Sequence, residues 1–169
     1  IDSQNGSVAI GLIALSAAEA VKEKCSKKEI LEIIEHAILN TTVYIGLDTL
    51  DYIVKGGRVS ANKKKFANLL RINPILTFEK EGVKPIGKSY GSNNKIEKLI
   101  KFVTARLPKG SFRIGIAHGN APELAEKASS HFKSLGAKKV ITTELGPALG
   151  VHAGPNSLVI ATQLLPDKK

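Results

Sequence analysis

The chain has 169 residues, of which 43% are hydrophobic and 24% charged, and its formal net charge is +10. A globular chain of this length buries roughly two-thirds of its unfolded surface, so it can build a substantial core. The most apolar stretch, residues 8–21, includes Ser16 and Glu19 and is too short to span a bilayer. The single cysteine, Cys25, excludes an internal disulfide and fits a reducing cytoplasm.

The positive charge allows several interpretations. A basic surface attracts phosphate, anionic lipid headgroups or an acidic protein, and it also simply keeps a protein soluble. The densest run is residues 63–65, three consecutive lysines. A basic nucleic-acid-binding module is therefore an alternative function, although binders of single strands use aromatic platforms and this chain has scattered Tyr and Phe and no Trp.

Two helices are expected first. Residues 7–24 are rich in Ala, Gly and Ser, which lets a helix pack closely against another element. The second helix begins at Ser26, which has capping-box spacing to Glu29, and it runs to Leu39 with an apolar stripe. A β-branched strand is predicted over residues 41–47.

A short helix is predicted next, with Asp48 as its cap and Gly56-Gly57 as its end. The paired glycines permit positive φ and can direct Arg58 away from the helix end. The alternative is that Gly56 only stops the helix and Arg58 is a surface cation.

Residues 62–70 are predicted as a short helix, and residues 71–79 and 83–88 as a hairpin that turns at Glu81-Gly82. Pro74 lacks an amide donor and indicates an edge or bulged position. The apolar residues here belong either to the core or to the wall of an apolar tunnel: Leu69, Leu70, Ile72, Ile75 and Leu76.

The remaining elements alternate. An amphipathic helix follows Ser92 and ends before Pro108, and a second helix is expected between Asn120, as its cap, and Gly136. Strands are predicted over residues 112–117, 139–144 and 157–164, with an irregular Gly- and Pro-rich loop over residues 146–156. This order predicts an α/β fold with α+β character, a two-layer domain whose mixed sheet is covered by helices on one face.

The sequence carries no enzyme motif in its proper context. No G-x-G-x-x-G follows a strand. The pattern G-x-x-x-x-G-K-[ST] occurs at residues 82–89 (GVKPIGKS), but this stretch is predicted as a hairpin strand and not as a loop between a strand and a helix, so ATP binding is not expected. The spacing G-x-S-x-G occurs at residues 87–91 (GKSYG), but one short match without its structural context is weak evidence for a nucleophile elbow, and there is no cluster with metal-ligand spacing. The sequence therefore predicts no catalytic residue, no metal and no cofactor.

Five stretches carry a family resemblance: residues 1–4, 46–60, 71–76, 118–123 and 152–156. Taken in this order they resemble the DegV family of bacterial fatty-acid-binding proteins. Residues 46–60 (GLDTLDYIVKGGRVS) are similar to the family's D-T-L-x-Y-L-x-K-G-G-R-I block, residues 71–76 (RINPIL) to its I-x-P-I-L strand, and residues 152–156 (HAGPN) to its H-x-G-P-G loop. Residues 1–4 and 118–123 also resemble family stretches. The resemblance spans nearly the whole chain.

The resemblance implies that residue 1 lies in the middle of a longer protein. Residues 1–40 would be the helical tail of a truncated N-terminal domain, and residues 41–169 a DegV-like C-terminal domain. In the family the N-terminal domain supplies Ser and Thr hydroxyls that help hold the fatty-acid carboxylate.

The resemblance also implies a site and a role. His152 matches the family histidine that contacts the ligand headgroup, with Gly154 and Pro155 in the same motif; without the resemblance, a loop histidine bonded to backbone carbonyls is the simpler interpretation. Arg58 and Gly57 belong to the K-G-G-R block, and Ile72, Ile75 and Leu76 would contact the acyl chain. His118, at a strand end, is explained equally well by turn formation.

By the same resemblance the protein would be a non-catalytic carrier of a long-chain fatty acid. The sequence adds the expectations of a cytoplasmic location, no integral membrane segment and no nucleic-acid partner. A separate ATP-dependent fatty-acid kinase would phosphorylate the carboxyl group of the bound acid. One position departs from the family: many members have a K-x-R pair after the hairpin, and here Tyr90 stands in place of the arginine. A contact made by that arginine would be weakened or replaced.

Overall fold

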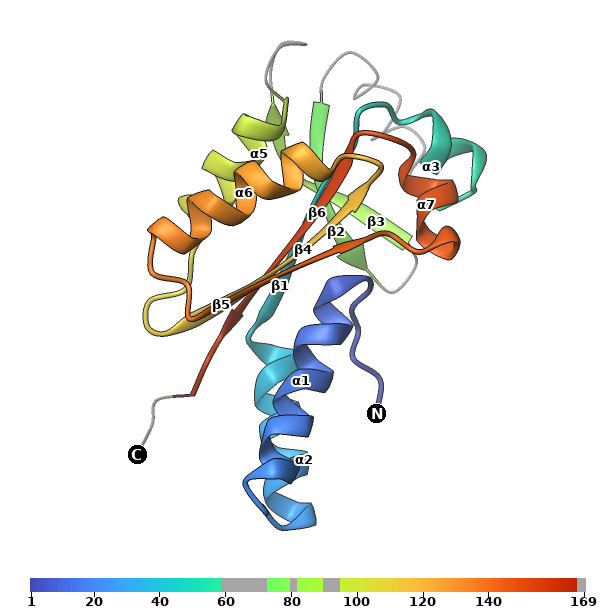
Figure 1. The fold of residues 1–169 in the computed structure, drawn as a ribbon. Helices are drawn as coiled ribbons and strands as arrows, with labels where there is room; N and C mark the ends of the chain where they lie inside the picture. Colours follow the sequence, from blue (N-terminus) through green and yellow to red (C-terminus); the bar gives the residue numbers. More distant parts are fainter. Residues whose placement is uncertain (59–72, 80–81, 90–94, 167–169) are drawn as a thin grey trace.

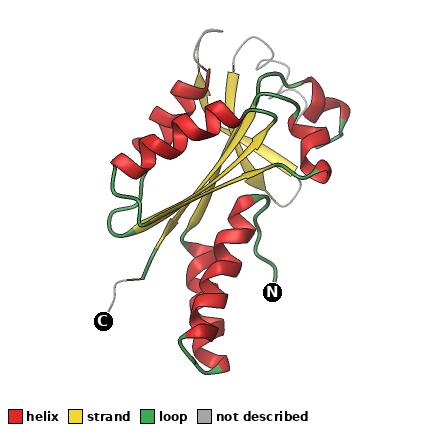
Figure 2. Cartoon of the chain, in the orientation of Figure 1, coloured by secondary structure: helices red, strands yellow, loops and turns green. Residues whose placement is uncertain are grey.

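The computed structural model describes residues 1–58, 73–79, 82–89 and 95–166. Within these residues the chain forms alternating helices and strands (Figure 1; Figure 2). In chain order they are α1 Val8–Lys22, α2 Lys27–Leu39, β1 Thr41–Gly46, α3 Asp51–Lys55, β2 Asn73–Glu79, β3 Gly82–Ser89, α5 Lys95–Thr104, β4 Phe112–Gly119, α6 Pro122–Ser134, β5 Lys139–Glu144, α7 Pro147–Ala153 and β6 Ser157–Leu164. The predicted order is confirmed apart from the additional helix α7. The helix predicted over residues 62–70 lies outside the described residues.

The strands form one six-stranded sheet in the order β3-β2-β1-β6-β4-β5. The β4–β5 pair is parallel and the other described pairs are antiparallel, so the sheet is mixed as predicted. Strands β2 and β3 form the expected hairpin, with a register shift between Ile75 and Leu76. Ile75 pairs with Gly87 and Leu76 with Pro85, so the extra residue is Ile86 of β3, whereas Pro74 pairs in register with Lys88. The bulge expected at Pro74 therefore lies in the partner strand.

Helices α5 and α6 cover one face of the sheet, and Figure 1 shows them side by side. Leu99 and Val103 of α5 and Phe132 of α6 are almost fully buried. They pack on strand residues such as Ile114 and Ile160 in one continuous apolar cluster. This layer is the core that the i, i+3, i+4 patterns predict.

The opposite face is also covered, so the expectation of helices on one face alone was wrong. Helix α1 packs on β4, β6 and β1, and its residues Val8 and Leu12 join a second apolar cluster with Ile45 and Val159. A Cβ on Gly115 of β4 would lie 2.5 Å from a Val8 methyl carbon, so the glycine allows α1 to approach the sheet closely. Helices α3 and α7 pack together at the other end of this face (Figure 1).

A chain of buried polar contacts connects the two N-terminal helices to the sheet. Ser16 Oγ lies 3.2 Å from both the Leu12 carbonyl and Gln163 Oε1, and Gln163 Nε2 donates to Thr41 Oγ1 at 2.9 Å. Thr41 Oγ1 in turn donates to the Ala37 carbonyl of α2 at 2.6 Å. Each of these buried groups is therefore satisfied by another element. The division of the chain at residue 40 remains a prediction.

Two predicted helix caps were wrong. Helix α3 begins at Asp51 after the N-cap residue Leu50, while Asp48 Oδ1 accepts a bond from Lys95 Nζ at 3.1 Å. Helix α6 has Ala121, not Asn120, as its N-cap because Pro122 occupies its first turn. The residue before a proline is held out of the α region, and this places the boundary at Ala121.

The loop predicted over residues 146–156 contains the seven-residue helix α7. Gly146 is its extended N-cap and Pro147 stands at its start, where a proline is well tolerated because that amide has no helical acceptor. The helix ends at Gly154, whose φ is +73°. His152 therefore lies in the last turn of a helix and not in an irregular loop.

Candidate ligand-binding site

A small cavity lies where α3 and α7 meet the sheet, and we call it the inner cavity. Its volume is about 170 Å³. The lining comes from both helices and from strands β1, β2, β3 and β6: Ser7, Ile45, Leu47, Ile53, Arg58, Phe78, Val83, Leu145, Ala148, Leu149, His152, Ala153 and Val159. Apart from Ser7, Arg58 and His152 these side chains are apolar, and no carboxylate is among the described residues that line it.

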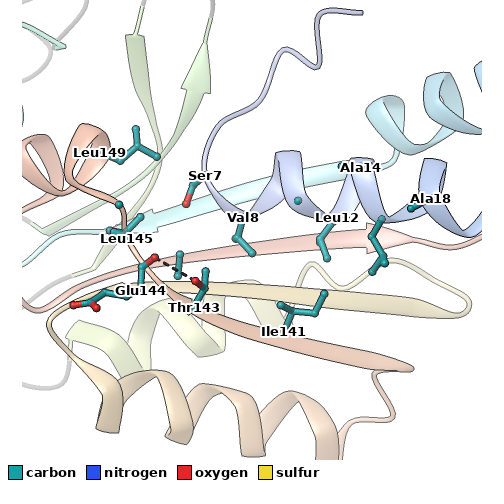
Figure 3. A pocket seen from close by; sticks show the side chains of 14 residues that line it. Ser7, Val8, Leu12, Ala14, Ala18, Ile141, Thr143, Glu144, Leu145 and Leu149 are labelled. Carbon is teal, nitrogen blue, oxygen red and sulfur yellow. Dashed lines mark hydrogen bonds between the residues drawn. The ribbon is translucent and has the colours of Figure 1, made fainter.

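A larger groove runs between α1 and the edge strand β5, and we call it the outer groove (Figure 3). Its volume is about 630 Å³. Val8, Leu12, Ala14 and Ala18 of α1 line one side, and Ile141 of β5 lies opposite, as Figure 3 shows. The inner cavity and the outer groove share three lining residues, Ser7, Leu145 and Leu149, so the two spaces adjoin.

Helix α7 brings His152 to the inner cavity. Leu145, Leu149 and His152 follow i, i+4, i+7 spacing, which places them along one side of the helix and its entry. The His152 Nδ1 atom is buried and has no hydrogen-bond partner among the described residues. A buried polar atom without a partner is uncommon in folded proteins, and this makes His152 a candidate ligand-binding residue.

The end of α3 brings Arg58 to the same cavity. Gly57 has a φ of +67°, the left-handed conformation that glycine adopts without strain at a helix end. The Arg58 amide donates to the Ile53 carbonyl at 3.2 Å, and Nη1 donates to the Gly56 carbonyl at 3.1 Å. The Arg58 side chain is exposed and contributes positive charge at the edge of the cavity.

The other predicted site residues lie in different places. Gly154 is buried at the end of α7, and Pro155 after it is exposed. Leu76 is fully buried on the same face of the sheet as α3 but does not line the inner cavity. Ile75 points to the opposite face and packs in the cluster under α5 and α6. Ile72 lies outside the described residues, as do Tyr90 and the lysines at 63–65.

Sequence reasoning missed several lining residues. Ser7, Phe78, Leu145 and Leu149 line the inner cavity and were not singled out. The helical spacing of Leu145, Leu149 and His152 was a usable signal, but the Gly and Pro content of this segment favoured a loop. Ser7 has a φ of +56° and precedes α1, a position that no local pattern indicated.

His118 takes part in a turn. Its Nδ1 atom accepts a hydrogen bond from the Ala121 amide at 3.2 Å, just before α6. It lines neither the inner cavity nor the outer groove. This agrees with the turn-forming interpretation of His118.

Two features are absent from the described part of the chain. No group of three or more His, Cys, Asp or Glu side chains there is arranged to hold a metal ion. None of the helices in that part has the length and apolar character needed to cross a membrane.

The fold and the cavity together define an α/β protein with an apolar cleft that carries one guanidinium and one imidazole. The family described as the uncharacterised protein family DegV matches residues 1–164, and the chain belongs to this family. A DegV domain-containing protein of Streptococcus pneumoniae is 35% identical over 73% of this chain and 44% of its own length. Another, from Clostridium perfringens, is 33% identical over 91% of this chain and 56% of its own length. The chain thus spans about half the length of these curated relatives.

Solved structures share the fold. A DegV family protein of Thermus thermophilus, described as binding fatty acid, superposes with a TM-score of 0.85 at 22% identity, over 98% of this chain and 60% of that one. DegV of Bacillus subtilis, described as a fatty-acid-binding protein, gives a TM-score of 0.82 at 25% identity, over 98% and 60%. These likenesses establish the DegV fold for this chain.

Proposed function

We propose that the protein binds a long-chain fatty acid, with the acyl chain in the inner cavity and outer groove and the carboxylate beside Arg58 and His152. The observation that carries this proposal is that Arg58 and His152 line one apolar cavity that contains no described carboxylate. Solved relatives of this fold are described as fatty-acid-binding proteins, which supports the same class of ligand.

The apolar lining can supply most of the affinity. The inner cavity of about 170 Å³ is smaller than the roughly 300–1,000 Å³ of typical ligand pockets, whereas the outer groove of about 630 Å³ lies within that range. A palmitate-sized tail has about fourteen methylene groups, and burial at ~0.8 kcal/mol each gives about 11 kcal/mol before the entropic costs of binding. A tail that leaves the inner cavity past Leu145 and Leu149 enters the outer groove.

The polar end needs specific partners. A carboxylate removed from water without a hydrogen bond is very unfavourable, and a charge-assisted bond contributes about 1.5–3 kcal/mol. An imidazole N–H and a guanidinium both donate such bonds. Arg58 and His152 would thus fix the orientation of the acid while the tail provides the affinity.

In this proposal the protein is a carrier and not an enzyme. A separate ATP-dependent kinase would phosphorylate the exposed end of the acid in the cytoplasm, and the positive charge of Arg58 would favour the anionic acyl phosphate. The kinase partner and the location are predictions from the family resemblance.

The test uses the full-length product of the gene, because the chain covers only part of its relatives. Mass spectrometry of the denatured purified protein should detect a long-chain carboxylic acid in near-stoichiometric amount. After lipid removal, calorimetric titration should show tight binding of palmitic acid and much weaker binding of its methyl ester, which lacks the negative charge. Absence of acid in the first experiment and of binding in the second would refute the proposal. Addition of the kinase and ATP should then yield acyl phosphate only when the protein is loaded.

A further inference from the structure

Helices α3 and α7 interlock through two glycines and two rings. A Cβ added to Gly56, just after α3, would overlap the Nδ1 atom of His152 and lie 2.7 Å from its Cε1 atom. In the reverse direction, a Cβ added to Gly154, just after α7, would lie 2.6 Å from Cε2 of the Tyr52 ring. Each helix therefore ends in a glycine on which an aromatic ring of the other helix rests.

The backbone at Gly56 does not itself require glycine. Its φ of −72° and ψ of −4° are right-handed helical values that every residue adopts. Gly57 is the opposite case, since its φ is +67° and nothing lies within 4 Å of an added Cβ. The first glycine of the pair makes room for the imidazole, and the second permits the chain to turn.

Gly56 also contacts the other charged group of the site. Its carbonyl accepts the bond from Arg58 Nη1, so the guanidinium is held beside the residue on which the imidazole rests. The Gly56 amide is used within α3, where it donates to the Tyr52 carbonyl at 2.9 Å. Gly56 thus contacts both the guanidinium of Arg58 and the imidazole of His152, the two basic groups that line the inner cavity.

We propose that Gly56 is a positioning residue of the ligand site, which sets the His152 imidazole in the inner cavity by having no side chain and orients Arg58 through its carbonyl. This inference depends on the proposed role of His152 in holding a carboxylate. It gives the first glycine of the K-G-G-R block a function separate from that of the second.

A set of variants of the full-length, lipid-free protein tests the proposal with palmitic acid as the probe. Gly56→Ala should weaken binding about tenfold or more, since it displaces the ring that donates a charge-assisted bond. The double variant Gly56→Ala/His152→Ala should bind as His152→Ala does, within about twofold, because the two changes then act on one interaction. Additive losses would overturn the proposal. Gly150→Ala in α7 is the matched control, because its added Cβ meets only the Leu145 carbonyl at 3.9 Å; it should bind like the wild type.

A second readout follows the imidazole directly. In two-dimensional NMR spectra of the lipid-free protein, the ring resonances of His152 should shift in Gly56→Ala and stay in place in Gly150→Ala. Unchanged ring resonances in Gly56→Ala, or shifted resonances with unchanged affinity, would overturn the proposal. If the wild type binds no palmitic acid, the proposed function fails, and the ring resonances alone then decide whether Gly56 positions His152.

The same variants remain informative if Gly56→Ala does not fold. Removal of the imidazole relieves the overlap, so the double variant should recover a cooperative melting transition near that of His152→Ala. A double variant that is also unfolded would show that Gly56 serves another purpose, and the proposal would be wrong.

Discussion

Arg58 and His152 line one cavity, although the first follows α3 and the second lies in the last turn of α7. Their separation in the sequence gave no direct sign of this proximity. The packing of α3 against α7 brings them together, and the described lining offers no negative charge to neutralise them. The arrangement suits an anionic group at the end of an apolar molecule.

Replacement of His152 by Ala should weaken binding of palmitic acid by about tenfold to a hundredfold. The expected loss corresponds to one charge-assisted hydrogen bond of about 1.5–3 kcal/mol. Equilibrium dialysis against labelled acid measures it. The control is His36→Ala in α2, a helix that does not line the inner cavity; equal affinities of the His152 variant and this control would remove His152 from the site.

Leu149→Asn should reduce affinity for a long acid more than for a short one. Leu149 lines both the inner cavity and the outer groove, so an acyl chain that occupies both spaces, as proposed, lies against it. Loss of an apolar contact of this size is worth about 1.5–3 kcal/mol at most. Titrations with palmitic and octanoic acid should show the difference, whereas Val151→Asn, at a side chain that is 62% exposed on the same helix, should change neither. Equal losses for both acids would argue against this path.

Glu19→Gln should lower the stability of the fold. Arg113 Nη2 donates to Glu19 Oε2 at 2.9 Å, and the Arg113 side chain is 7% exposed while that of Glu19 is 44% exposed. The substitution leaves a buried guanidinium without a counter-charge; because Glu19 is half exposed, we expect about 1–2 kcal/mol, below the cost for a fully buried pair. The melting temperature should fall by about 2–8 °C. Glu32→Gln, which disrupts the exposed pair with Lys28, is the control and should have almost no effect.

The start of α2 should respond to acid. Hydrogen bonds from the Ser26 side chain and backbone hold the pKa of Glu29 below its ordinary value of 4.5. Because the folded pKa is lowered, the contribution of this capping box to stability is present above pH 4.5 and is lost as the pH falls through the folded pKa.

Ser26→Ala removes the hydroxyl and should raise the pKa of Glu29 back toward 4.5. A carbon-detected NMR titration of the Glu29 carboxyl group measures this directly. A titration midpoint that is the same in the variant and the wild type would contradict the capping-box interpretation.

Much of the fold was predictable because its local signals are strong. The capping box of Ser26 and Glu29 is present, and Gly136 ends α6 with a φ of +84°. The cap predicted at Asn120 was wrong because Pro122 places the start of α6 after Ala121. The cap predicted at Asp48 was wrong because α3 begins later, after Leu50. Helix α7 was missed because its Gly and Pro content is typical of a loop, whereas Pro147 in fact stands at a helix start.

The site was predictable only in part. Family motifs indicated Arg58 and His152, and the structure brings these two together. The apolar wall was harder to predict, because residues 75 and 76 lie on opposite faces of β2 and an apolar pattern does not tell which face borders a cavity. Ser7 and Phe78 reach the inner cavity through tertiary packing, which leaves no local trace in the sequence.

The polar chain from Ser16 through Gln163 to Thr41 has a mechanical consequence. Hydrogen bonds are directional, so a shift of α1 by one turn would break the Ser16 contact and leave the Gln163 amide oxygen buried without a donor. Helix α1 is therefore held at a fixed position on the sheet. A ligand bound between α1 and β5 has to fit a channel of fixed width, because moving α1 away from the sheet would break the same hydrogen bonds.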